Sequence, residues 1–227
     1  MKKEGFIVIN KPKGITSFGV VAKLRKVTGI KKVGHCGTLD PLATGVLICA
    51  VGRSATKKIS TLINSDKQYI ADIELGKTSN TYDMEGDIKK KNIKKIPTRF
   101  ELKNILKFFT GEIFQTPPIF SAKKIEGRRA YELARKGVDV KMKKNKVNIY
   151  KINLISYKFP HIKLKINCGS GTYIRSLTHD IGKKLKTGAV LMDLKRTMVG
   201  NFTLENAFNL DELNEKNIFK NIFNLGN

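Results

Sequence analysis

Residues 34–47 read GHCGTLDPLATGVL, and this stretch decides how the fold and the chemistry of the chain are interpreted. Its side chains are small, apolar or uncharged at neutral pH, apart from the carboxylate of Asp40. Gly34, Gly37 and Gly45 leave the surrounding backbone bare, so that a bulky ligand can approach the acid closely. One interpretation is structural, because Asp-Pro commonly opens a turn. The other is chemical, because a single carboxylate in such a loop can act as a nucleophile or a general base.

A metal site is a further interpretation of this stretch, because His35, Cys36 and Asp40 offer three types of ligand. Structural zinc takes four protein ligands, and catalytic zinc takes three together with water. No CxxC, HxxxH or HExxH motif accompanies the stretch, and His161 and His179 are isolated in the sequence. A Ser/His/Asp triad has equally little support, since a chain of this length offers such residues by chance. We therefore expect no metal site.

The charge of the chain indicates a polyanionic partner. The 227 residues carry 44 Lys and Arg against 19 Asp and Glu, a net charge of +25, and such a charge opposes compaction. Nucleic acid is the first candidate and an anionic membrane surface the second. The three cysteines form no disulfide framework, which is typical of a reducing compartment. No stretch approaches the roughly 20 apolar residues of a membrane span, and no signal peptide begins the chain, so we expect a cytoplasmic protein.

Strand patterns dominate the rest of the chain. Residues 67–75 and 161–168 alternate between apolar and polar side chains, which predicts two half-buried strands. Residues 6–9 and 45–52 are apolar runs that predict short buried strands, and a last strand is expected near 190–203. The pattern predicts an α+β fold, a single domain over residues 1–227 with a mixed, largely antiparallel sheet flanked by helices.

Helices are expected at irregular intervals between these strands. Ser17 is the predicted N-cap of the first helix, and Thr172 caps a helix that follows the GSGT turn. Two more helices are expected near residues 98–109 and 211–224. Residues 78–97 read as a surface loop, and residues 115–146, which carry a double proline and many basic side chains, read as a cationic insertion.

Three side chains outside the Asp40 stretch are candidates for a site. Tyr69 lies on the alternating strand 67–75 and can present its ring to a base. Arg175 follows a glycine-rich turn suited to anions, and its guanidinium can bind a phosphate or orient a carboxylate. Lys11 lies in the tight KPKG turn near the N-terminus. The structural alternative for Tyr69 is an ordinary core aromatic, and that for Arg175 is a surface ion pair.

Five stretches resemble a known family when they are taken together. They are INKPKGITSFGVV, GHCGTLDPLATGVLICAVGRSATK, KQYIADIELGKTSNTYDMEGDI, QTPPIFSAKKIEGRRAYELARKG and CGSGTYIRSLTHDIGKKLKTGA. In this order and spacing they closely resemble the TruB family of tRNA pseudouridine(55) synthases, from about residue 5 to about residue 212. The resemblance implies the pseudouridine synthase fold and a reaction in which one T-loop uridine of tRNA is isomerised to pseudouridine. It also implies that no cofactor and no catalytic metal are used.

The resemblance also implies roles for particular residues. Asp40 matches the catalytic aspartate, and Tyr69 matches the ring that stacks on the target uracil and assists proton removal from C5. Arg175 matches the arginine that forms an ion pair with the aspartate. Lys11 matches the lysine of the family's KP motif, which supports the active-site loop.

Two further matches concern substrate binding. His35 matches the residue that fills the space left in the T-loop by the flipped base, and Leu194 matches an apolar residue that lines the uracil pocket. The implied partner is the T-loop and T-stem of tRNA, and we expect a monomer. Many family members carry a C-terminal PUA domain, which we expect to be absent here because the chain stops at Asn227. The basic insertion at 115–146 then carries more of the RNA binding.

Two other functions remain open at this stage. A non-catalytic tRNA-folding factor would use the same cationic surface to remodel tRNA, and Asp40 would be incidental. A metal-dependent nuclease would need a cluster of acids, and the sequence offers none. Replacement of Asp40 by Asn separates the first of these from an isomerase, since it removes isomerisation and leaves RNA binding intact.

Overall fold

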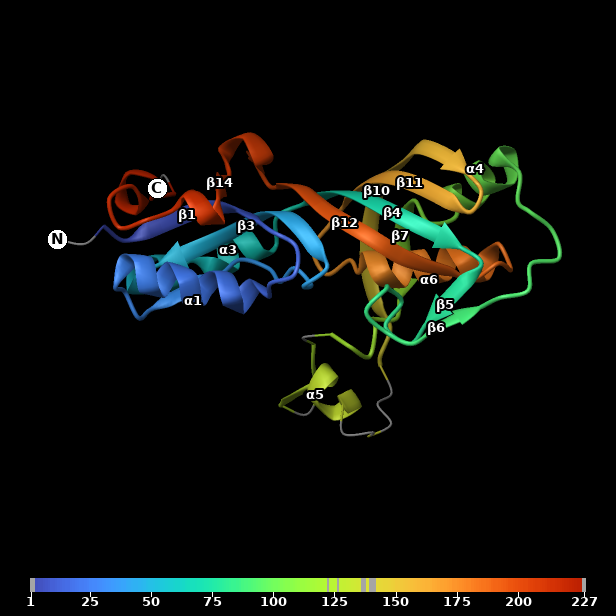
Figure 1. Cartoon of the computed structure of the whole chain (residues 1–227), viewed down its shortest axis with the longest axis horizontal. Coiled ribbons are helices and arrows are strands. Elements are labelled where there is room, and N and C mark those ends of the chain that lie inside the picture. The colour runs from blue at the N-terminus through green and yellow to red at the C-terminus, as the bar shows by residue number, and fades with distance from the viewer. Residues whose placement is uncertain (1–2, 122, 126, 136–137, 139–141, 226–227) are drawn as a thin grey trace. The chain divides into compact units, whose positions relative to one another are not determined.

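Antiparallel strands dominate the structure, a computed structural model that describes residues 3–121, 123–125, 127–135, 138 and 142–225 (Figure 1). Ten strands form one mixed sheet, in which eight follow the order β14-β1-β3-β12-β4-β11-β10-β7, while β13 pairs with β12 and β2 with β3. Two short hairpins, β5-β6 and β8-β9, stand apart from it. The predicted α+β fold, with a largely antiparallel sheet flanked by helices, is confirmed.

The strands have the following bounds: β1 Gly5–Lys11, β2 Val33–His35, β3 Ala43–Val51, β4 Lys67–Leu75, β5 Lys77–Ser79, β6 Ile88–Lys90, β7 Gly111–Gln115, β8 Lys124–Ile125, β9 Arg128–Arg129, β10 Asn145–Lys158, β11 His161–Cys168, β12 Ala189–Val199, β13 Phe202–Thr203 and β14 Phe208–Asn209. The helices are α1 Ser17–Thr28, α2 Arg53–Lys57, α3 Ile59–Ile63, α4 Arg99–Lys107, α5 Ala130–Arg135 and α6 Ile174–Lys184, and short 3-10 turns follow at Leu204–Asn206, Leu210–Glu212 and Ile218–Lys220.

The chain divides into two compact units. Unit 1 comprises Met1–Tyr69 and Lys195–Asn227, and unit 2 comprises Ile70–Leu194. In unit 1, β1 runs antiparallel to β3 from the pair Gly5↔Val51 to the pair Lys11↔Gly45. Strand β2 also pairs antiparallel with β3, from Val33↔Val51 to His35↔Cys49. Helix α1 covers one face of these strands (Figure 1). The residues of β3 are buried except Thr44, which explains its continuous apolar sequence.

The core of unit 1 lies between the strands and the segments that cover them. Phe6, Val8, Val46 and Ile48 alternate along β1 and β3 toward one face, where α2, α3 and the C-terminal Phe223 pack against them. The opposite face of the same strands is also buried. The two-sided burial gives the Asp40 stretch a rigid support on its C-terminal side.

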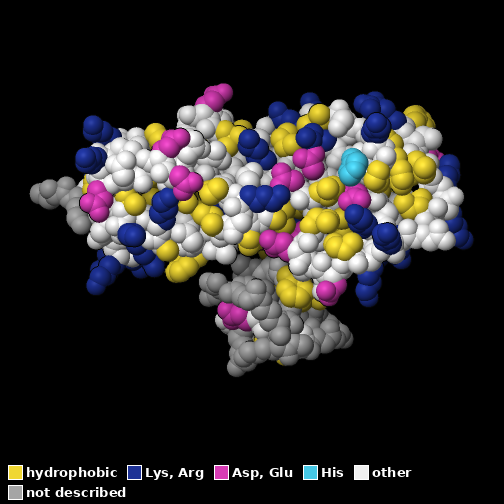
Figure 2. All heavy atoms as spheres, viewed as in Figure 1, with side chains coloured by type: hydrophobic (Ala, Val, Ile, Leu, Met, Phe, Trp, Pro, Cys, Tyr) yellow, Lys and Arg dark blue, Asp and Glu magenta, His cyan; other side chains and the backbone are white. Residues whose placement is uncertain are grey.

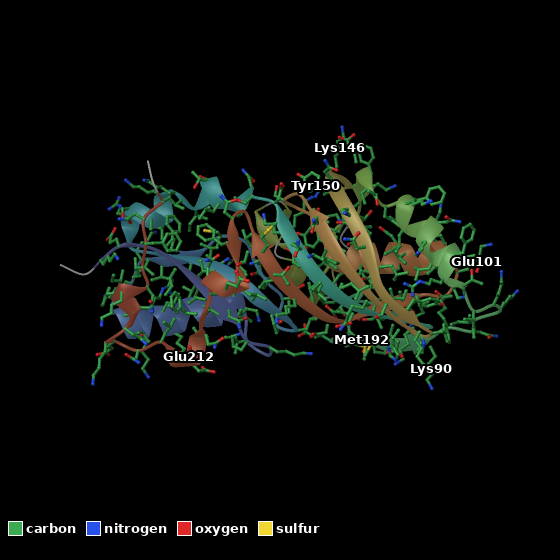
Figure 3. All side chains as sticks on the ribbon, turned by 90° about the horizontal axis from the view of Figure 1, so that it is seen from above. Lys90, Glu101, Lys146, Tyr150, Met192 and Glu212 are labelled. Atoms are coloured by element: carbon green, nitrogen blue, oxygen red, sulfur yellow. The ribbon has the colours of Figure 1, made fainter. Side chains whose placement is uncertain are left out.

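In unit 2, strand β10 pairs antiparallel with both β11 and β7. Lys146 on β10 forms an ion pair of 2.8 Å with Glu112 on β7, and Lys146 and Tyr150 project from the edge of the unit in Figure 3. Helix α6 packs beneath these strands with Ile174, Leu177 and Ile181 buried. The predicted alternation of β4 and β11 is confirmed by their burial patterns.

The N-caps predicted for two helices are wrong. Thr16, not Ser17, caps α1, because its hydroxyl accepts a hydrogen bond from the Gly19 amide at 2.9 Å. Thr172 does not cap α6, because its hydroxyl is turned to the carbonyl of Gly169. The side chain of Gln115 takes over at that end of the helix, where it accepts from the Tyr173 amide at 2.8 Å and donates to the Tyr173 carbonyl at 3.0 Å.

The helix expected near 211–224 is also absent from the described residues, which form two 3-10 turns and an extended end there. Asparagine side chains explain the difference. Asn217 donates to the Glu212 carbonyl at 2.9 Å and accepts from the Asn214 amide at 2.9 Å, so local side-chain bonds replace the helical ones.

The segments expected to be irregular hold some regular structure. Residues 77–90 include the β5-β6 hairpin rather than a loop alone. The described part of the 115–146 insertion contains β8, β9 and α5, and residues 122, 126, 136–137 and 139–141 of that prediction lie outside the described chain. No helix in the described ranges is long and apolar enough to cross a membrane.

Candidate active site

The Asp40 stretch forms the connection between β2 and β3, and its backbone carbonyls are bonded one after another. The carbonyls of Gly37 and Thr38 accept from one arginine, and that of Leu39 accepts from Ser17. The Asp40 carbonyl accepts from the Ala43 amide at 3.0 Å, and that of Pro41 from the Gly14 amide at 2.8 Å. Since each carbonyl from 37 to 41 has a donor, the loop is held in one conformation.

Lys11 and Ser17 tie this loop to the N-terminal segment. The Lys11 ammonium is fully buried and donates to the carbonyls of Pro12 at 2.8 Å, Ile15 at 2.7 Å and Pro41 at 3.4 Å. The Ser17 hydroxyl donates to the Leu39 carbonyl at 3.0 Å and accepts from the Leu39 amide at 2.8 Å. Ser17 therefore anchors the loop instead of capping its helix.

The arginine that donates to the carbonyls of the loop is Arg196 of β12. This residue was not singled out from the sequence. Its guanidinium is 1% exposed and donates to the carbonyls of Val46 at 2.8 Å, Gly37 at 3.1 Å and Thr38 at 3.5 Å. The sequence did contain an indication of its importance. Arg196 stands two residues after Leu194, and residues two apart in a strand lie on the same face, so Arg196 faces inward in an apolar strand. A cation at an inward strand position indicates a structural or functional partner.

One glycine lets the backbone of Arg196 approach the loop, and a second shares its left-handed conformation. Gly45 has φ +102°, and a Cβ atom there would overlap the backbone of Arg196. Gly37 also has φ +102°, and a Cβ atom there would face the Arg196 guanidinium at 3.7 Å. The predicted role of these glycines was to admit a ligand, whereas in the structure Gly45 admits the protein's own backbone and Gly37 serves its left-handed conformation.

Cys36 begins the loop with its side chain buried, and its amide donates to the Ile48 carbonyl at 2.8 Å. Burial raises the pKa of the Cys36 thiol to about 11, although the nearby charges of Arg196 and Lys67 oppose the rise. The thiol is therefore protonated at neutral pH and is a poor metal ligand. Within the described part of the chain, no three His, Cys, Asp or Glu side chains are grouped so that they could hold a metal ion.

The other predicted site residues of unit 1 are Tyr69 and His35. Tyr69 lies on the buried face of β4 and is 7% exposed, so its ring is an inward aromatic. His35 ends β2, where it pairs with Cys49 of β3 and is half-buried. Unit 1 thus holds Lys11, His35, Asp40 and Tyr69, four of the six residues implied by the resemblance.

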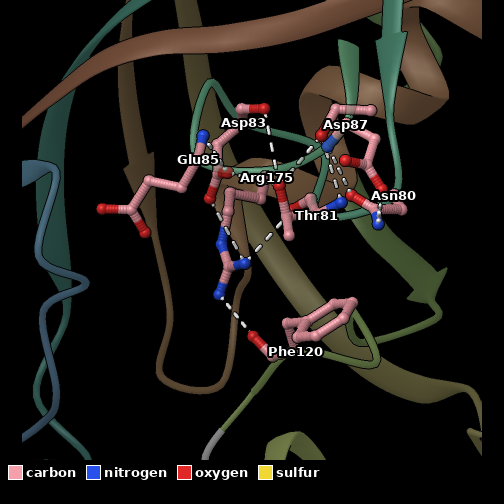
Figure 4. Close-up of polar contacts among 8 residues, drawn as sticks. Asn80, Thr81, Asp83, Glu85, Asp87, Phe120 and Arg175 are labelled. Carbon is pink, nitrogen blue, oxygen red and sulfur yellow. Dashed lines mark hydrogen bonds and ion pairs between the residues drawn. The ribbon is translucent and has the colours of Figure 1, made fainter. Parts of the chain in front are cut away.

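Arg175 and Leu194 belong to unit 2. Arg175 lies in the first turn of α6 and is 6% exposed; it donates to the carbonyls of Thr81 at 3.2 Å and Phe120 at 2.9 Å (Figure 4). Leu194 is 6% exposed in the middle of β12. The ion pair between Arg175 and Asp40 stays a prediction.

Asp83 is a second residue that the sequence reasoning missed. Its carboxylate is 1% exposed and forms an ion pair with Arg175, with 3.4 Å between Oδ2 and Nη1 (Figure 4). It also accepts from the Thr81 hydroxyl at 2.5 Å and from the Glu85 amide at 3.0 Å. The surrounding segment reads as a polar loop, so the sequence carried no sign that this acid is buried. Asp83 fixes the position of the guanidinium.

Comparison with known proteins defines the class. Residues 25–174 match the family model described as "TruB family pseudouridylate synthase (N terminal domain)", and residues 175–222 match "tRNA pseudouridylate synthase B C-terminal domain". The chain therefore falls in the class of pseudouridylate synthases, enzymes that isomerise uridine within RNA. The predicted single catalytic domain without a PUA domain stays a prediction.

The chain belongs to the TruB family of tRNA pseudouridine synthases. It is 48% identical to tRNA pseudouridine synthase B of Clostridium tetani, over 94% of this chain and 74% of the relative. It is 46% identical to the protein of that name in Protochlamydia amoebophila, over 96% of this chain and 84% of the relative. The predicted family, fold and enzyme class are confirmed.

A solved structure gives the same fold. One chain of the crystal structure of a Cbf5-Nop10-Gar1 complex superposes with a TM-score of 0.71 and 32% sequence identity, over 92% of this chain. The present chain spans 53% of the length of that solved chain.

Proposed function

We propose that this enzyme converts the T-loop uridine at tRNA position 55 to pseudouridine, with Asp40 as its catalytic aspartate. The observation that carries the proposal is the loop of Asp40, in which the carbonyls of residues 37–41 are each bonded. A fixed loop supports catalysis because the carboxylate is positioned before the substrate arrives.

The chemistry is an isomerisation, so the atoms of substrate and product are the same. The C1′–N1 glycosidic bond breaks, the uracil turns, and a C5–C1′ bond forms. C5 then loses its proton, and N1 carries one in the product. Asp40 acts either as a nucleophile that bonds to C1′ or as the group that leads to a glycal intermediate. In both routes the carboxylate has to be ionised, which is the role proposed for a neighbouring Arg175.

Substrate binding begins with extrusion of the target base. A uridine folded inside the T-loop is unreachable, and flipping it out costs a few kcal/mol. Stacking of the uracil on Tyr69 recovers roughly 1–3 kcal/mol. In this proposal Leu194 lines the uracil pocket, His35 fills the space that the base leaves, and Lys11 holds the loop from behind.

The remaining parts of the proposal concern partners and place. The net charge of +25 supplies sequence-independent attraction to the backbone of the tRNA T-loop and T-stem, and the basic insertion at 115–146 adds to it. The three cysteines are free and buried, which fits a cytoplasmic protein. We propose that the enzyme acts as a monomer.

The test is release of tritium from tRNA labelled at uridine C5, measured for the wild type and for Asp40→Asn. We expect release by the wild type in the presence of a chelator and a loss of at least about a thousandfold in Asp40→Asn, because the amide cannot act as a nucleophile. Asp211→Asn is the matched control, since that carboxylate is 87% exposed and pairs only with Lys23 among the described side chains.

Binding of tRNA is measured on the same samples. Release by Asp40→Asn at the wild-type rate would contradict the role of Asp40. Tight binding without release by either protein would favour the tRNA-folding factor instead.

A further inference from the structure

The lysines of unit 2 are concentrated at one end of it. Residues 88–110 and 183–186 contain eleven of the 44 Lys and Arg of the chain but one of the 19 acids. These segments are one-eighth of the chain and hold a quarter of its basic residues, so general enrichment in lysine does not explain them. Figure 2 shows Lys and Arg side chains at the end of unit 2 that carries α4 and β6, and Figure 3 shows Lys90 and Glu101 there.

Some of these lysines line a cleft of about 620 Å³, which falls within the range of ligand pockets. We call it the basic cleft and define it by Lys94, Lys95, Glu101, Lys184, Leu185 and Lys186. Lys95 forms an ion pair of 2.6 Å with Glu101. Among the described side chains, Lys94 and Lys186 have no acidic partner. The cleft therefore keeps a net positive charge after its internal pair is counted.

The backbone of Lys186 indicates that the charge of the cleft does not arise only from the general preference of helix C-termini for basic residues. It adopts φ +60° where α6 terminates, and the amides of Thr187 and Gly188 bond back to the Gly182 carbonyl at 3.1 Å and 3.0 Å. Helices usually place glycine in this left-handed position, because a side chain there is strained. A lysine costs folding stability at this position, and it lines the cleft.

An aromatic ring lies beside the cleft. The ammonium of Lys184 stands over the ring of Phe108 at 4.5 Å from its centroid, and Phe108 is 66% exposed. A lysine cluster next to an exposed aromatic ring suits a nucleic-acid strand, whose phosphates pair with the lysines and whose bases or sugars contact the ring. The same combination also suits an anionic membrane surface, and the RNA substrate of the proposed function is what favours a nucleic-acid strand here.

We propose that the basic cleft is a second contact for the substrate RNA and binds phosphates of the tRNA strand away from the target uridine. The inference rests on the proposed function, which brings RNA to Arg175 at the start of α6. Lys184 lies nine residues further along this helix, or about 14 Å at 1.5 Å per residue. A strand of a few nucleotides covers that length, so the cleft is within reach of the same arm of the tRNA.

The test compares two triple variants that remove the same charge. Lys94→Ala/Lys184→Ala/Lys186→Gly alters the cleft. Lys26→Ala/Lys31→Ala/Lys32→Ala is the control in unit 1, where these lysines are exposed and Lys26 lies in the last turn of α1 as Lys184 does in α6. The Kd for an unmodified tRNA transcript is measured at several KCl concentrations. For the cleft variant we expect a Kd about ten times higher at low salt and a log–log salt slope smaller by about two, with kcat/KM reduced in parallel.

The single variant Lys186→Gly tests whether a loss of tRNA affinity could be caused by unfolding of the protein. We expect its Tm to rise, because glycine relieves the left-handed backbone, while its affinity for tRNA falls. Equal changes in both triple variants, or unchanged tRNA affinity with loss of binding to phosphatidylserine vesicles, would overturn the proposal. Tritium release by the wild type is recorded separately. Failure of the proposed isomerase function is thereby distinguished from failure of the cleft to bind RNA.

Discussion

Arg196 carries its charge into the interior of unit 1 and satisfies it with carbonyl oxygens of the loop that holds Asp40. A buried cation without hydrogen bonds is costly, so the folded chain keeps these carbonyls turned toward the guanidinium. The loop and the arginine are therefore fixed together. Arg196 does not touch substrate in this account; it is a positioning residue that acts through Asp40.

We expect Arg196→Met to lower the single-turnover rate of isomerisation at saturating tRNA by at least about a hundredfold, because the carbonyls of Gly37 and Val46 lose their donor. The unpaired carbonyls also cost about 1–3 kcal/mol of unfolding free energy. Arg196→Lys retains the charge and one donor, and it should recover part of the rate. The rates come from rapid-quench experiments and the Kd from filter binding.

A purely structural role would give another pattern. In that case the single-turnover rate, measured well below the Tm of each variant, would equal that of the wild type, and Arg196→Lys would show no recovery. Such a result would remove Arg196 from the account of catalysis.

At the scale of secondary structure elements, strand β3 depends on one position without a side chain. Gly45 combines φ +102° with a backbone contact to β12, whereas Gly171 has φ +78° with nothing within 4 Å of the position that a Cβ atom would take. We expect Gly45→Ala to lower the free energy of unfolding by more than about 3 kcal/mol, because strain and overlap add. Gly171→Ala should lower it by only about 1 kcal/mol. Urea unfolding followed by circular dichroism measures both.

Equal losses in the two glycine variants would contradict this account. They would mean that the left-handed backbone alone sets the cost and that the close approach of Arg196 to β3 adds nothing.

The elements also differ in how far the sequence determines them. The alternation in β4 and β11 and the apolar run of β3 were predictable, because burial on one or both faces fixes the pattern directly. Helix ends were less predictable. Thr16 and Ser17 are adjacent hydroxyl residues, and Ser17 was predicted as the cap. Its hydroxyl bonds instead to Leu39, which is distant in sequence, and Thr16 caps the helix.

The site was predictable to the extent that its motifs are local. Asp40, Tyr69 and Arg175 stand in stretches that resemble a family, whereas Asp83 and Arg196 gain their importance from contacts made only after folding. Asp83 pairs with a residue more than ninety positions away, and Arg196 with carbonyls about 150 positions away. Periodicity and composition carry no information about such pairs.

At the scale of the whole molecule, the stability of the fold should depend on pH through His179 of α6. Its imidazole stacks on Tyr82 with the ring centroids 4.1 Å apart. Burial lowers the pKa of His179 below its usual value; Asp180 opposes the change and Lys183 adds to it. The unfolded chain then binds a proton that the folded chain does not, so stability is present above the unfolded pKa and is lost as pH falls.

We therefore expect the Tm of the wild type to fall as pH decreases from about 7.5 to about 5.5, and the slope to be smaller in His179→Gln. Burial raises the pKa of Asp180, so at lower pH the folded chain binds a proton there more readily than the unfolded chain, and this stabilises the fold as pH falls. This opposite effect sets the lower limit of the pH range in which His179 dominates. His161→Gln, which changes an exposed histidine, is the matched control. A slope that is unchanged in His179→Gln would exclude this histidine as its source.

The two buried thiols of unit 1 allow motion of the Asp40 loop to be timed. Cys36 begins the loop and Cys49 lies in the C-terminal half of β3, and both side chains are fully enclosed. A thiol reagent reaches either sulfur only after the chain opens around it. Each labelling rate is normalised to that of the urea-unfolded chain. A faster normalised rate at Cys36 than at Cys49 would report local opening of the loop. Equal normalised rates would mean that the loop opens only when the whole of unit 1 unfolds, so that Asp40 is held in its place for as long as the fold itself persists.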